Sequence, residues 1–178
     1  LRNLKINISA DYEKNLNDLQ YITKMGYQSV NRYILGSIDQ NTVGMTFRIN
    51  LNVTPEFSVQ YYGSPFISRG TYSSFKYVTD PEAKSYNSRF SEYSWDEASD
   101  GSIRLDEDND LVTDYSMSDP DFNFHQFRSN FVAKWEYRLG SFIYFVWSAE
   151  RTGQNEKSSV SFSESYKQLK DVFPNNVF

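Results

Sequence analysis

Long segments of this chain alternate strictly between apolar and polar residues. From Leu4 to Glu13 every even position is apolar or aromatic and every odd position is polar, and from Val43 to Val53 the odd positions are apolar. A period of two places the apolar side chains on one face of an extended strand, whereas a helix would scatter them around its circumference. The chain must therefore fold largely as β-strands with one apolar and one polar face.

Turn signals divide the pattern into hairpins. Thr54-Pro55-Glu56 supplies one tight turn, because proline suits the first corner of a turn, and Arg138 to Ser141 supplies a second. Gly26 and the stretch 39–42 are expected to interrupt the N-terminal third, and a short helix is expected over 163–173. The predicted strands are 4–13, 19–24, 31–38, 42–53, 57–66, 124–137 and 142–150, with a last strand starting at Asn176; Ser129 and Val132 are exceptions to the alternation within them.

The connections between these strands differ greatly in length. Two turns are short, whereas the segments 67–121 and 151–174 are long enough to be external loops. In an antiparallel meander every second connection lies at the same end, and short turns at one end with long loops at the other characterise outer-membrane barrels. The strands also have the roughly 9–11 residues that a tilted strand needs to cross a bilayer. We therefore expect an all-β fold, an antiparallel up-and-down transmembrane β-barrel, with residues 1–178 forming a single barrel segment.

Alternation alone does not say which face meets lipid. A soluble barrel or sandwich would turn the apolar face inward, and a transmembrane barrel would turn it outward. The chain is 17% aromatic but only 39% hydrophobic, with a mean hydropathy of −0.64. Tyr12, Tyr61, Trp135 and Tyr137 share the apolar parity and lie at or near strand ends, as expected of rings anchored at a lipid–water boundary. This favours the membrane alternative, because a soluble core would need a partner for every buried tyrosine hydroxyl.

Composition excludes several classes of site. With no cysteine and a single histidine, His125, the chain has no thiolate or histidine-cluster metal site and no thiol nucleophile. No nucleophile-elbow, zinc-protease or phosphate-loop motif occurs, so we assign no catalytic residue and expect no enzyme. The net charge of −5 argues against a nucleic-acid partner.

Neither an apolar run long enough for a membrane helix nor a signal peptide is present. Because the sequence opens at Leu1, we expect that it begins inside a longer protein with an upstream signal.

Two long strings resemble a known family. DQNTVGMTFRINLNVTPEFSVQYYGSPFIS (39–68) and DPDFNFHQFRSNFVAKWEYRLGSFIYFVWS (119–148) are similar to the C-terminal β-barrel domain, of unknown function, of uncharacterised Bacteroidota outer-membrane proteins that also carry an N-terminal sugar-binding-like module. Leu139 stands where that family commonly has proline, and family members continue beyond Phe178 into a last strand. The chain is therefore expected to be the C-terminal part of a larger barrel, truncated at both ends.

The resemblance implies a location in the bacterial outer membrane, with outer-membrane lipid and other envelope proteins as partners. The implied role is the membrane anchor or pore of a surface protein involved in glycan recognition or uptake. Two alternatives remain: a soluble all-β binding module, and a scaffold subunit of a larger outer-membrane assembly.

One stretch of the chain is strongly acidic. The segment 80–121 holds 13 acidic residues against three basic ones. Within it Asp106, Asp108 and Asp110 have the alternate spacing that lets carboxylates converge on Ca²⁺. Leu111 and Met117 stand where the EF-hand pattern requires Gly and Glu, so that motif fails. A solvated acidic loop is the favoured interpretation, and Ca²⁺ is the one cofactor considered.

The polar strand faces supply a second set of candidates. Charged groups inside a barrel either pair with one another as a plug or select solutes in a channel. Because both signs of charge are present, the plug is the favoured alternative. The candidate lumen-lining residues are Arg48, Asn50, Arg128, Asn130, Lys134 and Glu136.

Overall fold

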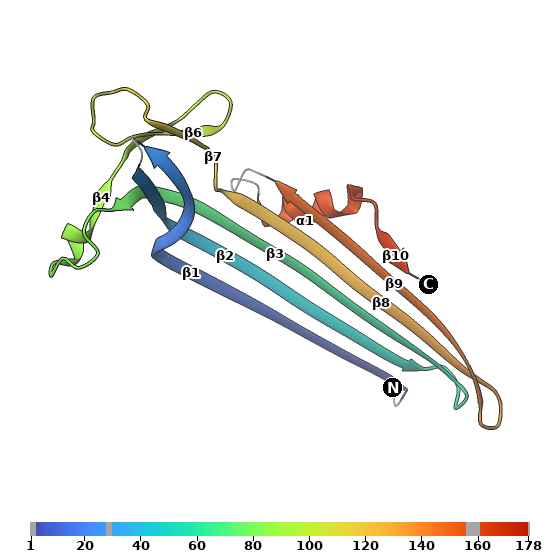
Figure 1. Ribbon diagram of the computed structural model, residues 1–178. Helices are drawn as coiled ribbons and strands as arrows, with labels where there is room; N and C mark the ends of the chain where they lie inside the picture. Colours follow the sequence, from blue (N-terminus) through green and yellow to red (C-terminus); the bar gives the residue numbers. More distant parts are fainter. Residues whose placement is uncertain (1–2, 28–29, 156–160, 178) are drawn as a thin grey trace. The chain divides into compact units, whose positions relative to one another are not determined.

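The structure is a computed structural model that describes residues 3–27, 30–155 and 161–177 (Figure 1). It is all-β with antiparallel pairing, as the alternation predicts, apart from one short α-helix and a single 3₁₀ turn. The elements are β1 (Leu4–Tyr27), β2 (Val30–Asn52), β3 (Phe57–Val78), η1 (Tyr86–Arg89), β4 (Phe90–Glu92), β5 (Ser94–Glu97), β6 (Ser102–Asp106), β7 (Tyr115–Ser118), β8 (Phe122–Arg138), β9 (Ser141–Asn155), α1 (Phe162–Asp171) and β10 (Asn175–Val177).

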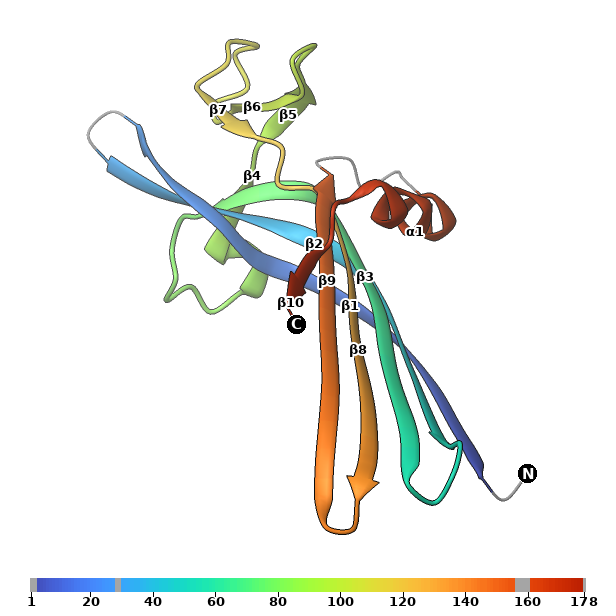
Figure 2. The ribbon, with the colours of Figure 1, turned by 90° about the vertical axis from the view of Figure 1, so that its right-hand side faces the viewer.

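The main sheet is an up-and-down meander. Its strands follow the order β1-β2-β3-β8-β9-β10, and β4 pairs with β3. The two short turns, β2 to β3 and β8 to β9, lie at the same end of the sheet in both views (Figures 1 and 2). Among the described residues the sheet is open, because its order runs from β1 to β10 without returning.

The strands are longer than the sequence pattern predicts, and the predicted interruptions at 14–18 and 39–42 are wrong. β1 and β2 each continue through these stretches without a break in the strand. The polar residues there pair across the two strands: Lys14 Nζ lies 3.3 Å from Asp39 Oδ2, and Asn15 Nδ2 donates to Gln40 Oε1 at 3.3 Å. Turn-forming residue types are thus used as cross-strand pairs, which stabilise a ladder. The expected interruption at Gly26 agrees with the end of β1 at Tyr27.

The helix and the last strand lie close to their predicted places, whereas the predicted loop 67–121 begins inside β3, which runs to Val78. The predicted helix over 163–173 is α1, and the predicted last strand at Asn176 is β10. The residue before the helix, Ser161, caps it: its Oγ accepts from the backbone N–H of Glu164 at 3.2 Å. This Ser-x-x-Glu spacing is the capping-box pattern. The predicted loop 151–174 begins inside β9, and its residues 156–160 lie outside the described residues.

The chain divides into two compact units, which are described separately. Unit 1 comprises 1–13, 41–69 and 123–178, and unit 2 comprises 14–40 and 70–122. Unit 2 contains most of the predicted acidic loop, which forms the three-stranded sheet β5-β6-β7. Alternate apolar residues of β6 and β7 enter a buried cluster in this unit, whose members are Ile34, Phe75, Tyr93, Ile103, Leu105, Tyr115 and Met117.

Unit 1 is built differently, as one layer of sheet partly covered by α1. Its buried hydrophobic residues are Ile67 and Leu169, and its buried polar residues are Ser68, Asn123, His125, Ser129 and Ser165. None of the described helices has the length and apolarity needed to span a membrane.

Candidate functional site

Most apolar side chains of β1, β2 and β8 in unit 1 lie on one face of its sheet, which we call the apolar face, whereas Phe142, Tyr144 and Val146 of β9 lie on the opposite face. In the β8–β9 register Phe131 pairs with Trp147 and Trp135 with Ile143, so apolar residues of the two strands share a face. Phe47 of β2 lies on the same face, with its ring centroid 6.4 Å from that of Phe127 in β8. The alternation predicted from the sequence is thus continued in register from strand to strand.

Much of the apolar face is exposed. Ile8 is 69% exposed, Trp135 51% and Phe145 52%. Monomeric soluble proteins rarely expose a continuous apolar patch of several strands' width, because each large side chain loses about 1.5–3 kcal/mol of burial free energy. The apolar face is therefore a contact surface for something other than water.

The opposite face, which we call the polar face, carries the predicted lumen-lining residues. Arg48, Asn50 and Asn130 line one shallow hollow with Tyr62, and Arg128 and Asn130 line a second. The β8–β9 register places the remaining two, Lys134 and Glu136, on this same face.

The contacts on the polar face are more varied than the predicted plug of mutual ion pairs. Arg128 Nε lies 3.8 Å from Glu150 Oε1, directly across the β8–β9 ladder. The Lys134 ammonium lies 4.2 Å from the ring centroid of Phe142 instead of contacting Glu136, whose carboxylate accepts from the backbone N–H of Gly140 at 2.7 Å. The charged side chains of this face thus make three kinds of contact: an ion pair across the β8–β9 ladder, a contact with an aromatic ring, and a hydrogen bond to the backbone of a turn.

The four predicted boundary aromatics occupy three levels of the apolar face. Trp135 and Tyr137 stand beside the β8–β9 turn, with ring centroids 6.3 Å apart. Tyr12 lies near the other limit of the unit, where its hydroxyl donates to Asn41 Oδ1 at 2.6 Å. Tyr61 lies between these levels, with its ring 5.8 Å from that of Phe47.

The helix α1 is attached to the sheet of unit 1 by polar contacts near both of its ends. Asn123 Nδ2 of β8 donates to Ser165 Oγ at 2.9 Å, and both residues are fully buried. At the C-terminal end Arg151 Nη1 donates to the carbonyls of Leu169 and Lys170 at 3.2 and 2.9 Å. The residue after the helix, Val172, has an extended backbone, so Arg151 satisfies carbonyls that a glycine cap would otherwise serve.

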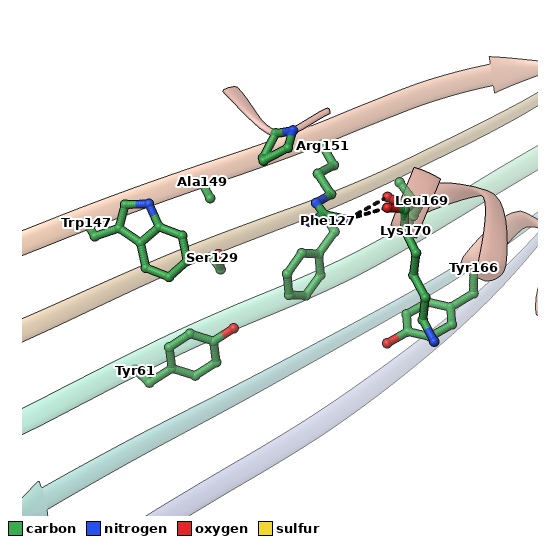
Figure 3. A pocket seen from close by; sticks show the side chains of 10 residues that line it. Tyr61, Phe127, Ser129, Trp147, Ala149, Arg151, Tyr166, Leu169 and Lys170 are labelled. Atoms are coloured by element: carbon green, nitrogen blue, oxygen red, sulfur yellow. Dashed lines mark hydrogen bonds between the residues drawn. The ribbon is translucent and has the colours of Figure 1, made fainter. Parts of the chain in front are cut away.

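A pocket of about 210 Å³ opens between α1 and the apolar face. Figure 3 shows the rings of Tyr61, Phe127 and Trp147 standing on the same side of the sheet as the helix. Ser129 and Ala149 are directly paired across β8 and β9, and their small side chains leave the space between these rings open. Arg151, Tyr166, Leu169, Lys170 and Pro174 complete the lining.

The acidic residues of unit 2 converge in a different set from the predicted one. Asp106, Asp108 and Asp114 each place one carboxylate oxygen within 4.8 Å of the others, whereas Asp110 accepts from the backbone N–H of Val112 at 2.8 Å. Asp106 accepts from two backbone N–H groups of its own loop, at 2.7 and 2.9 Å. Burial, and then the charge of Asp110, raise the pKa of Asp108. These carboxylates hold the loop in its conformation.

A second polar group of unit 2 is more enclosed. Arg32 of β2 contacts the carboxylate of Glu107 through Nε and Nη2, the latter at 2.7 Å from Oε1, and the Glu107 side chain is 9% exposed. Tyr115 of β7 donates its hydroxyl to the same carboxylate. The hydrogen bond to Glu107 raises the pKa of Arg32 further above its ordinary value. The contacts connect β2 with the β5-β6-β7 sheet inside unit 2.

The pocket beneath α1 was not predicted from the sequence, although the sequence contains one signal of it. Ser129 breaks the apolar alternation of β8, and Ala149 is a small residue in the apolar register of β9. Only the register and the docked helix show that the two lie together on the floor of one pocket. No family model, curated protein or solved structure matches the chain.

Proposed function

We propose that this chain is a membrane-spanning segment of a bacterial outer-membrane β-barrel, which anchors a surface protein in lipid. The observation that supports it is the exposed apolar face of unit 1, which runs in register through the meander. Outer-membrane strands turn such a face to lipid and their polar face to the barrel interior. Anchoring is the role, among those implied by the family resemblance, that this face supports.

The height of the apolar face agrees with a bilayer. Val53 stands at the β2–β3 turn, and Asp11, the residue before Tyr12, lies opposite Gly44 of β2. The apolar face between Trp135 and Tyr12 is therefore about ten residues long, the length of a typical transmembrane strand. At about 3.3 Å per residue and a tilt of about 40°, this spans about 25 Å of membrane normal, the height of the apolar band of outer-membrane barrels.

The two alternatives require different cover for the apolar face. A soluble binding module would need a second layer of apolar residues over it, and a scaffold subunit would need a protein partner. In unit 1 the described residues supply α1 alone as cover. Lipid covers the whole face at once, and for that reason we prefer the anchor.

The experiment compares neighbouring residues on opposite faces. Because the chain has no cysteine, Met45→Cys and Thr46→Cys each introduce a single labelling site. After labelling with a polarity-sensitive fluorophore and reconstitution into vesicles that contain brominated phospholipid, the probe at 45 should be strongly quenched and the probe at 46 should be little affected. Equal quenching at both sites, or no quenching at either, would exclude a lipid-facing apolar face.

A further inference from the structure

We propose that the pocket between α1 and the apolar face binds one acyl chain of an anionic, phosphate-bearing lipid, whose phosphate contacts the Lys170 ammonium. The inference rests on the proposed membrane location. It adds a defined lipid site, with a preference for the headgroup, to a surface that would otherwise contact lipid non-selectively.

The interior of the pocket suits a hydrocarbon chain. Its walls are the rings of Tyr61, Phe127 and Trp147, and its floor is the pair Ser129 and Ala149 (Figure 3). Apolar cavities of about 150 Å³ are large enough to hold a benzene-sized ligand. A pocket of about 210 Å³ that is open on one side can therefore accept a segment of acyl chain.

The charges at the pocket select the headgroup. Arg151 and Lys170 are its charged lining residues, both are cations, and no acidic side chain is among the residues that line it. Arg151 donates to the last carbonyls of α1, so its guanidinium serves to hold the helix. The Lys170 ammonium, 5.7 Å from the ring centroid of Tyr166, stands at the helix side of the pocket. A cation beside an apolar slot is complementary to a lipid with an anionic phosphate.

The position along the strands agrees with this assignment. Arg151 lies eight residues beyond Ile143, which pairs with Trp135 beside the short turn. The helix is thus at the opposite limit of the apolar band from that turn, where lipid headgroups meet water. Lysine side chains at this level extend their charged ends into the headgroup region.

The experiment uses Trp147 as the reporter in reconstituted full chain. With Trp95→Phe and Trp135→Phe as background substitutions, quenching of Trp147 is measured for brominated phosphatidylglycerol in a phosphatidylcholine bilayer, and for the reverse pair. We expect phosphatidylglycerol to be preferred about fivefold, the effect of one surface lysine on an anionic lipid. Lys170→Gln should remove the preference. Lys167→Gln is the matched control, because Lys167 contacts Glu164 at 3.5 Å and does not line the pocket, and it should retain the preference.

A second variant tests the acyl-chain slot. Ala149→Leu fills the floor of the pocket and should lower Trp147 quenching by either lipid, while the position-45 label stays quenched. Equal quenching by both lipids that is insensitive to Lys170→Gln would show non-selective lipid contact and overturn the site, leaving the membrane anchor intact. Loss of quenching at both Trp147 and position 45 would overturn the anchor and the site together.

Discussion

Gly63 in β3 makes room for an aromatic ring on the apolar face. A Cβ atom at this position would lie 2.3 Å from Cζ of Phe47, and that ring also contacts Tyr61 and Phe127, at centroid distances of 5.8 and 6.4 Å. The ring therefore has little freedom to move aside. The sequence shows that position 63 is a glycine but does not predict which ring contacts it, because the contact depends on the pairing of β2 with β3.

Replacing this glycine should be costly. We expect Gly63→Ala to lower the free energy of unfolding by about 1–3 kcal/mol, the usual effect of overpacking. Gly26→Ala is the matched control, since it is also a strand glycine and a Cβ there has nothing within 4 Å. Denaturant titration of the reconstituted protein gives both values. A similar loss in the two variants would contradict the steric explanation.

At the scale of elements, the β5-β6-β7 sheet and β2 are connected by the Arg32–Glu107–Tyr115 group. A carboxylate as enclosed as that of Glu107 needs both its cation and its hydroxyl donor, because an unpaired buried charge is strongly destabilising. Burial, and then the hydrogen bond to Glu107, raise the pKa of Tyr115 well above its ordinary value of 10.0, and burial raises that of Tyr93. These tyrosines are therefore neutral when folded at pH values where the unfolded chain ionises.

The sign of the resulting pH dependence follows from this difference. A folded-state pKa above the unfolded one contributes stability that is present below about pH 10 and is lost as the pH rises further. We expect the stability of unit 2 to fall progressively as the pH rises above about 10, and Tyr115→Phe to make this fall shallower. Tyr86→Phe, at an exposed tyrosine of the same unit, should behave as the wild type. Urea titrations along a pH series would measure the slopes, and equal slopes in all three proteins would contradict the assignment.

At the scale of the molecule, the described residues of unit 1 place no second layer over most of its apolar face, and among them two edges of the sheet remain open. β10 pairs with β9 from Ser148 to Glu150. Among the described residues, the part of β9 nearer the β8–β9 turn is therefore an unpaired edge of the sheet. β1 is the other edge. Exposed edges promote association with further strands, and a closed barrel removes them.

We expect the purified chain to require detergent and to migrate differently on a denaturing gel before and after boiling. The physical reason is that a lipid-facing sheet is kept from water by detergent and resists unfolding until heated. Solubility without detergent together with indifference to boiling would contradict the membrane anchor. Stoichiometric copurification of a protein subunit under the same conditions would favour the scaffold alternative.

The alternation of residues such as those from Val43 to Val53 determined the strands and their two faces, because side-chain direction in a strand is a local property with a period of two. Interruptions were harder to predict: those expected at 14–18 and 39–42 were wrong, because Asn15 and Asp39 each have a partner on the neighbouring strand. The six candidate lumen-lining residues share a face because residues of the same parity stay on the same side of the sheet from one paired strand to the next. Their contacts do not follow from parity, as Glu136 and Gly140 show.

Only the tertiary structure decided where residues distant in the sequence meet. In the acidic cluster Asp114 takes the place that the sequence predicts for Asp110. This depends on the loop conformation, which has positive φ angles at Asn109 and Leu111. The pocket required α1 to fold back onto β8 and β9, so that Ser129, Ala149 and Lys170 became neighbours. A local period specifies which way a side chain points from its own strand, whereas a site depends on long-range register and docking, which no local period contains.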